Sequence, residues 1–409
     1  MRILWVKTGP LLPLDTGGKR RTHAMLTEIS KTNEVLYLSL LPEGTQLDPN
    51  EESDPYAAKK TWVTTRSSGK QSPFFWLELV WSTLFSSRPY ALHKYEVREL
   101  QDQLLAISKA NAFDLVICDF LAPALNFAHI AFKFPTVLFQ HNIEAQIWQR
   151  LAASQASLLK RWYFGLQYRR MHRWERRLSA LFDGVITVSP DDAELARSDY
   201  HLTNVLGHVP TGVDVAAFQP APIPPAERPF TMGFLGSMDW MPNIDAAHYF
   251  VRDILPAVRA SRPDARFKII GRNPPARIRD LAVKDSGIEV TGTVADVQPH
   301  VHDCDAIVVP LKAGGGTRIK IFEAMAMGVP VVSTTIGAEG LSVTHGDDIL
   351  IADEAGDFAA TLLQLAGDRT LQQKLASQGR HQVESHHSWL AATRCFMDLC
   401  ARTCPPNPH

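Results

Sequence analysis

The sequence of 409 residues lacks several features that mark whole classes of protein. No run approaches the roughly 18 consecutive apolar residues that a membrane-spanning helix needs. The formal net charge is −1, so no overall positive charge favours nucleic acid as a partner. The apolar share of 45% is ordinary for a globular protein, and the length suits two α/β domains better than one.

The cysteines and the N-terminal segment indicate one compartment. The five cysteines are scattered and odd in number, which argues against a disulfide framework and suits a reducing environment. Residues 1–7 are apolar only briefly and lack a small-residue cleavage site, so they predict a first β-strand and not a signal peptide. We therefore expect a cytoplasmic protein.

Common cofactor and metal patterns are also missing. The glycines do not follow the G-x-G-x-x-G spacing, which disfavours a nicotinamide dehydrogenase, and no P-loop signature occurs. Cys400 and Cys404 have no second pair at metal-ligand spacing, so no zinc site is expected. His381, His386 and His387 are explained by exposed positions near a helix end.

Short β-branched runs alternate with segments of helical pattern along the chain. Buried strands separated by helices predict parallel sheets with right-handed crossovers, an α/β fold. The expected strands are 3–7, 35–40, 114–118, 136–139 and 185–188 in the first half, and 231–235, 266–270, 288–291, 306–309, 331–334 and 349–351 in the second.

A proline-rich segment separates the two halves. Four of the six residues at 220–225 are prolines, which neither a helix nor a central strand accepts. We expect two Rossmann-like, doubly wound domains that face a cleft. The first comprises residues 1–208 and is completed by a helix over about 388–404, and the second comprises residues 209–387. Ligands of such sheets bind at the carboxyl ends of the strands.

A glycine-rich segment after the strand 306–309 predicts an anion site. Gly314, Gly315 and Gly316 remove Cβ atoms where backbone must approach a ligand. A helix expected to begin near Thr317 would offer free N–H groups and its positive dipole end. The alternative is a glycine-rich turn before a solvated basic helix, and the residues alone leave both interpretations open.

Two cations and a carboxylate follow these glycines. Arg318 and Lys320 add fixed positive charge, although they lie about 200° apart on an ideal helix, so both reach one phosphate only if the first turn is irregular. Glu323 lies one turn beyond Lys320, where a carboxylate suits hydrogen bonds to vicinal hydroxyls such as those of a ribose.

Taken together, these segments resemble a known family. Residues 230–352 are similar to the C-terminal domain of the large retaining glycosyltransferase family with the GT-B fold, and the Gly-Gly-Thr-Arg-x-Lys sequence at 315–320 is typical of a bacterial polysaccharide-assembly subgroup. The resembling segments follow the family's order at residues 16–18, 140–144, 186–189, 210–214, 234–243, 292–294, 322–331 and 337–341.

The resemblance implies transfer of a sugar from a nucleotide diphosphate-sugar to an acceptor, with retained anomeric configuration. Residues 209–387 would bind the donor, and residues 1–208 would form the side of a saccharide or lipid-linked acceptor. The donor is a substrate; no cofactor and no metal ion are implied, and nucleic acid is not a partner.

The match is incomplete at the diphosphate. Glu323 matches the second of the family's two glutamates, the one expected on the ribose, but Gly315 stands where the first belongs. Ser237 stands where arginine is common, and the expected lysine is displaced. Arg318 and Lys320 are therefore the candidates for a diphosphate clamp that stabilises the leaving group.

The first half contributes glycines and a histidine. Gly17 and Gly18 would let a loop approach a ligand; the alternative is a turn with an exposed basic patch. His141 follows the strand 136–139 and therefore lies at its carboxyl end, and the resemblance places this histidine near the donor sugar. Glu144 either orients His141 or begins a helix. The expected donor contacts are Gly17, Gly18, Gly236, Ser237, Gly292, Val294, Gly315, Gly316, Thr317 and Glu323, and the residues expected in the chemistry are His141, Arg318 and Lys320.

Some signals have plainer explanations. Asp303 and Asp305 have the Asp-x-Asp spacing that binds a metal–diphosphate in other glycosyltransferases, but they precede a strand and so belong to its amino end. Residues 73–95 and 148–177 mix aromatic with basic side chains. The second stretch either rests on an anionic membrane, as a peripheral contact at its inner face, or packs on the core with a solvated basic face; the sequence favours the core.

Two other functions share this architecture. A nucleotide-sugar epimerase would convert the donor without an acceptor. A non-catalytic nucleotide-sugar-binding protein would bind and not turn over, and the missing first glutamate keeps that alternative open.

Overall fold

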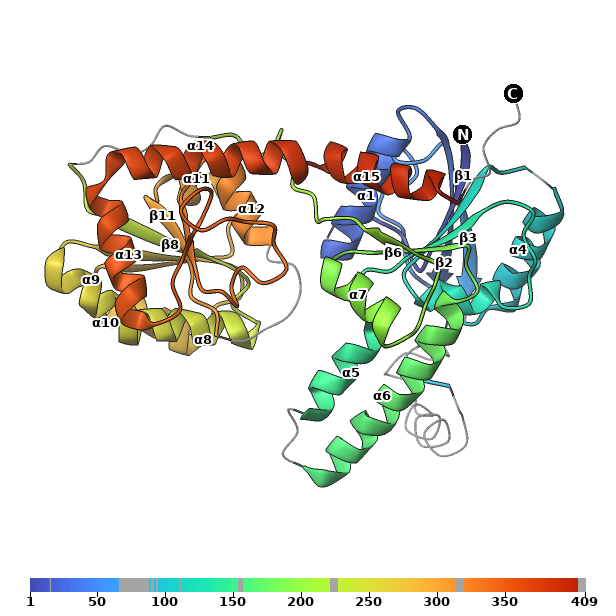
Figure 1. Cartoon of the computed structure of the whole chain (residues 1–409), viewed down its shortest axis with the longest axis horizontal. Coiled ribbons are helices and arrows are strands. Elements are labelled where there is room, and N and C mark those ends of the chain that lie inside the picture. The colour runs from blue at the N-terminus through green and yellow to red at the C-terminus, as the bar shows by residue number, and fades with distance from the viewer. Residues whose placement is uncertain are drawn as a thin grey trace. The chain divides into compact units, whose positions relative to one another are not determined.

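The protein consists of two α/β units (Figure 1). The computed structural model describes residues 1–14, 16–65, 88–89, 92, 95–110, 112–153, 157–220, 227–312 and 319–403. The first unit comprises residues 1–210 and 392–403, and the second comprises residues 211–391. Across these described ranges, no helix combines the length and the apolar character that crossing a bilayer requires.

The first unit is built on a parallel sheet in the order β3-β2-β1-β4-β5-β6-β7. Its central strands are buried along almost their whole length, as expected where helices cover both faces. The strands are β1 (Arg2–Lys7), β2 (Glu34–Pro42), β3 (Lys59–Thr65), β4 (Leu115–Asp119), β5 (Thr136–Phe139), β6 (Gly184–Thr187) and β7 (Val205–His208). The helices are α1 (Gly17–Ile29), α4 (Arg98–Ala110), α5 (Glu144–Ala153), α6 (Leu158–Ser179), α7 (Pro190–Ser198) and the 3-10 helix η1 (Ala122–Phe127).

The second unit repeats this plan with a parallel sheet in the order β10-β9-β8-β11-β12-β13. The strands are β8 (Thr231–Leu235), β9 (Arg266–Ile270), β10 (Ile288–Gly292), β11 (Ala306–Val309), β12 (Val331–Ser333) and β13 (Leu350–Ile351). The helices are α8 (Met241–Tyr249), the π-helix η2 (Phe250–Ile254), α9 (Leu255–Ser261), α10 (Ala276–Lys284), α11 (Gln298–His302), α12 (Ile319–Ala326), α13 (Ala355–Gly367) and α14 (Arg369–His386), and α15 (Trp389–Ala401) runs on into the first unit.

The strand order of each sheet reverses beside its first strand. β1 lies between β2 and β4, and β8 lies between β9 and β11. Connections that leave in opposite directions open a crevice at the carboxyl ends of these strands, which is where doubly wound sheets bind ligands. The doubly wound α/β architecture expected from the sequence is therefore confirmed.

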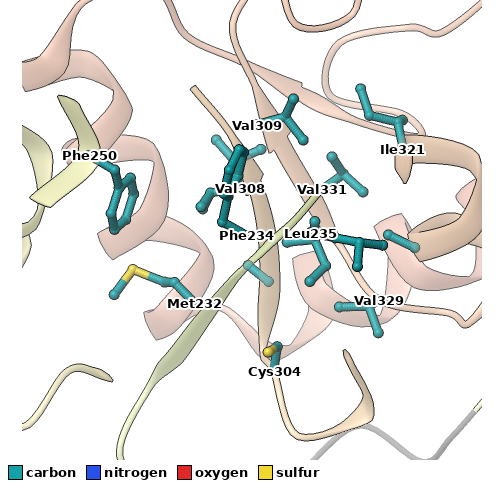
Figure 2. Packing of buried hydrophobic residues seen from close by; sticks show 14 of the residues in the cluster. Met232, Phe234, Leu235, Phe250, Cys304, Val308, Val309, Ile321, Val329 and Val331 are labelled. Atoms are coloured by element: carbon teal, nitrogen blue, oxygen red, sulfur yellow. The ribbon is translucent and has the colours of Figure 1, made fainter. Parts of the chain in front are cut away.

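Large apolar side chains fill the second unit between its sheet and its helices (Figure 2). Met232 and Phe234 of β8 and Ile321 of α12 are completely buried. Phe250 and Phe267 stack with their ring centroids 4.3 Å apart. Burial of each such side chain contributes about 1.5–3 kcal/mol, so this core fixes the end of β8 against α12.

The sequence located the buried strands better than those at the edges. The strands 136–139, 231–235, 266–270 and 306–309 have the expected bounds. β3 and β7 were not expected, and both lie at edges of the first sheet. β3 is rich in lysine and threonine, and β7 is only half-buried, so neither has a continuous apolar run.

The last helix, α15, completes the core of the first unit. Phe396 packs against Trp5 of β1 and Phe139 of β5, with ring centroids 5.7 Å and 4.9 Å apart. Leu399 lies against Gly207 of β7, where an added Cβ would come within 3.1 Å of the leucine side chain. α15 is thus an integral part of the first sheet's packing.

The exposed position expected for His387 is wrong. Its side chain is buried and stacks on Phe322 of α12, with ring centroids 3.9 Å apart. Burial lowers the pKa of His387 to about 4, so the ring packs as a neutral aromatic group at neutral pH. Polar neighbours in the sequence do not reveal this contact, which comes from a distant helix.

A buried carboxylate joins the helical hairpin of α5 and α6 to the first sheet. Glu175 of α6 accepts hydrogen bonds from the backbone N–H groups of Glu144 and Ala145 at 2.7 and 2.9 Å, and so caps the start of α5. It also accepts from Tyr200 Oη at 2.6 Å and from Gln140 Nε2. Burial raises the pKa of Glu175 to about 7 despite these donors.

We predict that Glu175→Gln destabilises the first unit by about 2 kcal/mol, because an amide NH₂ group replaces one acceptor oxygen and leaves a buried donor unpaired. Urea unfolding measures the change. The matched control is Glu194→Gln on the exposed side of α7, which should change stability by less than about 0.5 kcal/mol. Equal effects of the two substitutions would contradict the anchoring role.

Candidate functional site

The carboxyl ends of β1, β4 and β5 bring together a buried polar cluster in the first unit. Lys7 is the last residue of β1, and Asp119 is the last residue of β4. Asp119 Oδ2 accepts from Lys7 Nζ at 2.7 Å, Thr22 Oγ1 at 2.6 Å and Trp5 Nε1 at 3.0 Å. Its other oxygen, Oδ1, lies 2.7 Å from His141 Nε2, just beyond β5.

The charges within this cluster follow from its burial. Burial alone would raise the pKa of Asp119, but the interactions with Lys7 and His141 together outweigh burial and hold that pKa below its usual range. Burial lowers the pKa of His141 to about 4, against the opposing effect of Asp119. Burial also lowers the pKa of Lys7, against the opposing charge of Asp119. At neutral pH the cluster therefore contains an ionised Asp119 beside a neutral imidazole.

A strained residue covers the cluster. Phe120 has a left-handed backbone with φ of 75°, a conformation that costs on the order of 1–3 kcal/mol in residues other than glycine. Its ring stacks on His141 with centroids 3.8 Å apart and an interplanar angle of 22°. The Lys7 amine lies 4.2 Å from the centre of the same ring. Such strain is typical of functional sites, where the surroundings hold a side chain in place.

The two N-terminal candidate glycines differ in their surroundings. A Cβ added to Gly18 would lie 2.8 Å from Phe120 Cζ and 3.9 Å from His141 Nδ1. The missing side chain therefore lets α1 approach the aromatic ring, a packing role in addition to the expected ligand contact. Gly17 is the first residue of α1, and an added Cβ there would meet nothing within 4 Å.

The second unit brings Lys320 to the carboxyl end of β8. Lys320 Nζ donates to Asn243 Oδ1 at 2.8 Å and lies 4.6 Å from the centre of the Phe234 ring. A Cβ added to Gly236 would lie 2.9 Å from this amine. Asn243 Nδ2 in turn donates to the backbone carbonyl of Ser237 at 2.8 Å. The Lys320 amine is thus positioned beside the backbone that follows β8.

A second cation lies beside Ser237. Arg272, which follows β9, donates from Nε to Ser237 Oγ at 3.0 Å, and Ser237 Oγ donates to Asp239 at 2.5 Å. The hydrogen bond from Ser237 is the main cause that lowers the pKa of Asp239. Asn273 Nδ2 also donates to Asp239, at 3.2 Å. Arg272 therefore brings a guanidinium to the position where Ser237 replaces the arginine expected from the resemblance.

The remaining candidates lie at the same edge of the sheet or outside the described residues. Gly292 ends β10 with a φ of 72°, which glycine adopts without strain. The next residue, Thr293, accepts from the Asn273 N–H at 3.4 Å, so the turn that leads to Val294 adjoins the turn after β9. Glu323 lies one turn beyond Lys320 in α12. Gly315, Gly316, Thr317 and Arg318 fall outside the described residues.

The aspartates at the start of β11 have structural partners, as their position predicts. Asp303 pairs with Lys268 at 3.1 Å. Asp305 accepts from the Thr231 N–H at 2.7 Å and pairs with Arg228 at 3.2 Å. Among the side chains that the structure describes, no group of three or more histidines, cysteines, aspartates or glutamates could hold a metal ion.

Sequence reasoning missed three charged residues of these clusters. Lys7, Asp119 and Arg272 are not among the sequence candidates. Asp119 and Lys7 end runs that are otherwise apolar, and a charge at the carboxyl end of a buried strand was a usable signal. Glu144 begins α5, and the carboxylate that contacts His141 belongs to Asp119 instead.

Two family models match separate parts of the chain. Residues 60–217 match the model described as Glycosyltransferase Family 4, and residues 229–368 match the model described as Glycosyl transferases group 1. The boundary between these matches lies close to the division between the two units.

Part of the chain is also similar to a protein of Corynebacterium glutamicum. The GDP-mannose-dependent monoacylated alpha-(1-6)-phosphatidylinositol monomannoside mannosyltransferase is 29% identical over 201 residues, which are 44% of this chain and 52% of the relative. The chain thus spans about half the length of the curated relatives it matches.

Solved structures match over nearly the full length. A glycosyltransferase from Rickettsia africae superimposes with a TM-score of 0.64 and 15% identity, covering 98% of both chains. Anabaena HepE in complex with UDP and glucose gives a TM-score of 0.61 and 13% identity, covering 98% of this chain and 99% of the other. The chain therefore has the GT-B fold, with regions in its two units that match the Glycosyltransferase Family 4 and the Glycosyl transferases group 1 models.

Proposed function

We propose that the protein transfers a hexose from a nucleotide diphosphate-sugar to a saccharide or lipid-linked acceptor, with retention of anomeric configuration, in glycoconjugate synthesis. The observation that carries this proposal is the Lys320 amine beside Gly236 at the carboxyl end of β8. It lies in the part of the chain that matches the Glycosyl transferases group 1 model.

The comparisons support the classes of donor and acceptor. The Corynebacterium relative is named for GDP-mannose as donor and for a phosphatidylinositol monomannoside as acceptor. HepE was solved with UDP and with UDP-glucose. Both are consistent with a nucleotide diphosphate-sugar donor, and the phosphatidylinositol of the Corynebacterium relative is consistent with an acceptor held at a membrane surface. We therefore include peripheral contact with a membrane in the proposal.

In the proposed reaction, the bond between the anomeric carbon and the β-phosphate oxygen breaks, and a bond to the acceptor oxygen forms. The acceptor proton passes to the departing diphosphate. Negative charge builds on that diphosphate, where Lys320, Arg318 and Arg272 would stabilise it. Fixed cations of this kind supply the charge that a metal ion provides in other enzymes.

The donor's nucleotide and sugar would meet different residues. Glu323 suits the ribose hydroxyls, one turn beyond Lys320. Gly315 stands where the resemblance expects a glutamate beside the sugar. The proposed reaction therefore uses no carboxylate from that position. Gly292, with its left-handed backbone, would admit the donor close to the end of β10.

His141 would bind a sugar hydroxyl as a neutral acceptor. Its Nε2 lies 2.7 Å from an oxygen of the ionised Asp119, whose charge favours the tautomer with the ring proton on Nε2. Nδ1 then carries the lone pair, and it faces the first turn of α1 near Gly18. Asp119 therefore acts as a positioning residue, because it fixes which imidazole nitrogen can accept.

We predict that Lys320→Ala raises the Kd for the nucleotide diphosphate about tenfold or more, because a charged hydrogen bond to phosphate contributes about 1.5–3 kcal/mol. Thermal-shift titration against nucleotides and nucleotide-sugars measures it, since a bound ligand stabilises by mass action. Lys284→Ala, on the exposed end of α10, is the matched control.

Three outcomes decide the proposed function. Absence of stabilisation by every nucleotide and nucleotide-sugar in the thermal-shift titration would overturn it. Conversion of a donor into its epimer without acceptor would identify an epimerase instead. Binding without turnover on a panel of lipid and saccharide acceptors would identify a non-catalytic binding protein.

Arg318→Ala is predicted to lower the turnover of bound donor about tenfold or more, because the guanidinium acts on charge that develops in the transition state. The assay follows nucleotide release in the presence of acceptor. Arg279→Ala on α10 serves as the control for loss of an exposed arginine. Turnover equal to that of the unaltered protein would show that Arg318 is not part of the clamp.

His141 is predicted to stay neutral down to about pH 5, with its proton on Nε2, because burial lowers its pKa to about 4. Long-range ¹H–¹⁵N NMR of histidine-labelled protein reports both properties, and His141→Gln assigns the signal. The neutral form stabilises the fold fully above the unfolded pKa of about 6.5, and this contribution declines as the pH falls towards 4. A charged imidazolium at about pH 6, or a proton on Nδ1, would contradict the proposed role.

A further inference from the structure

The hairpin of α5 and α6 ends in exposed apolar side chains. Figure 1 shows the two helices extending beyond the sheet of the first unit. Four residues at the far end of the hairpin are exposed, by 38%, 81%, 74% and 57% in order, and together form what we call the hairpin tip: Leu151, Leu158, Leu159 and Trp162. Large apolar side chains that remain exposed together at one end of a helical hairpin indicate an interaction surface.

The same segment is strongly basic. Residues 145–174 contain no aspartate and no glutamate. The basic residues of this stretch are Arg150, Lys160, Arg161, Arg169, Arg170 and Arg173. The whole chain has 42 basic and 43 acidic residues, so an even distribution would place acidic residues in this stretch as well. The hairpin thus combines an apolar end with a local positive charge that the net charge of −1 conceals.

Apolar and basic residues follow one stripe of α6. Leu158, Trp162, Arg169, Arg173 and Arg176 are spaced so that they lie within about 60° of one another on an ideal helix. The rise from Trp162 to Arg169 is about 10 Å. A helix tilted onto this stripe would place the tip below the level of the arginines.

The arginines line a shallow hollow at the other end of the stripe. The hollow is lined by Tyr168, Arg169, His172, Arg173, Arg176 and Asp199. Asp199, at the end of α7, pairs with His172 at 2.9 Å and is the acidic group among these lining residues. Three guanidinium groups around one opening suit the oxygens of a phosphate group.

The structure separates two properties that the sequence mixed. The half of α6 that ends at Ser179 is buried against the first unit through Met171, Glu175 and Leu178, as the core-packing interpretation expects. The half that begins at Leu158 has no such cover: no residue from 158 to 166 is buried. Phe164 in this half packs on Trp148 of α5, with ring centroids 6.1 Å apart, and the outward side of the half stays exposed.

We infer that the hairpin tip docks on an anionic phospholipid surface. The apolar side chains of the tip enter the interface, and the arginines of the stripe lie at the lipid phosphates. This inference rests on the proposed function, because a lipid-linked acceptor is held in such a surface. Charge complementarity selects this occupant: a second copy would bring the same positive groups together, which costs energy.

Vesicle co-sedimentation of the full chain tests the inference. The vesicles contain phosphatidylcholine alone or with phosphatidylglycerol. We expect binding to the anionic vesicles, weakened by salt, and little binding to the neutral ones. Leu158→Ser with Leu159→Ser and Trp162→Ser should lower the partition coefficient about tenfold or more. Arg169→Glu with Arg173→Glu should have a comparable effect, through charge alone.

The matched control lies in the second unit. Val283 of α10 is 84% exposed, and Lys284 follows it. Val283→Ser with Lys284→Glu removes the same two kinds of group and should leave vesicle binding unchanged. Circular dichroism verifies that each variant is folded. Substitutions at exposed positions such as these are expected to leave the fold intact.

The outcomes separate this inference from the proposed function. Equal binding of wild type and tip variants, or no binding to either vesicle, would overturn the docking surface. Loss of self-association in the tip variants without any vesicle binding would assign the surface to a second copy and also overturn it. Thermal-shift titration with nucleotide-sugar is independent of the tip, so retained nucleotide binding in a variant that no longer binds vesicles shows that only membrane docking has been removed.

Discussion

A single buried carboxylate sets the arrangement of the first unit's site. Asp119 ends a fully buried strand, and its charge is tolerable there only because Lys7, Thr22, Trp5 and His141 converge on its two oxygens. These partners come from β1, α1 and the residues after β5, so one interaction joins the elements that border the reversal of strand order. The strained backbone of Phe120, the start of α1 at Gly18 and the imidazole of His141 all adjoin this carboxylate.

The second unit uses the same position in its sheet for a different purpose. At the end of β8 the side chain is missing altogether, at Gly236, and a cation from α12 occupies the space. Arg272 reaches the neighbouring Ser237 from the end of β9. Both cations thus come from elements other than the one on which the resemblance expects them. The positive charge is kept while its place in the sequence changes, which suits a requirement for charge at one point in space.

The sequence was most informative where burial dictates residue type. Strands covered on both faces must be apolar throughout, and β5, β8, β9 and β11 were located to the residue. The edge strands β3 and β7 need no such run and were missed. For the site, the position of His141 after a buried strand was visible, whereas its contact with Asp119 depends on the register of two sheet neighbours. Likewise, the sequence showed that residues 241–243 displace the lysine that the resemblance expects. It did not show that Asn243 accepts a hydrogen bond from Lys320. Pairwise contacts between distant segments follow from packing, which composition and spacing do not encode.

The path of the chain has a consequence for the order in which the protein can fold. The second unit is continuous, whereas the first needs Phe396 and Leu399 of α15 to cover Trp5, Phe139 and Gly207. These residues follow the whole second unit along the chain, so they leave the ribosome after it. During synthesis, the unit that is made first must therefore wait with an open apolar face, while the unit made second can close as soon as its own sequence has emerged.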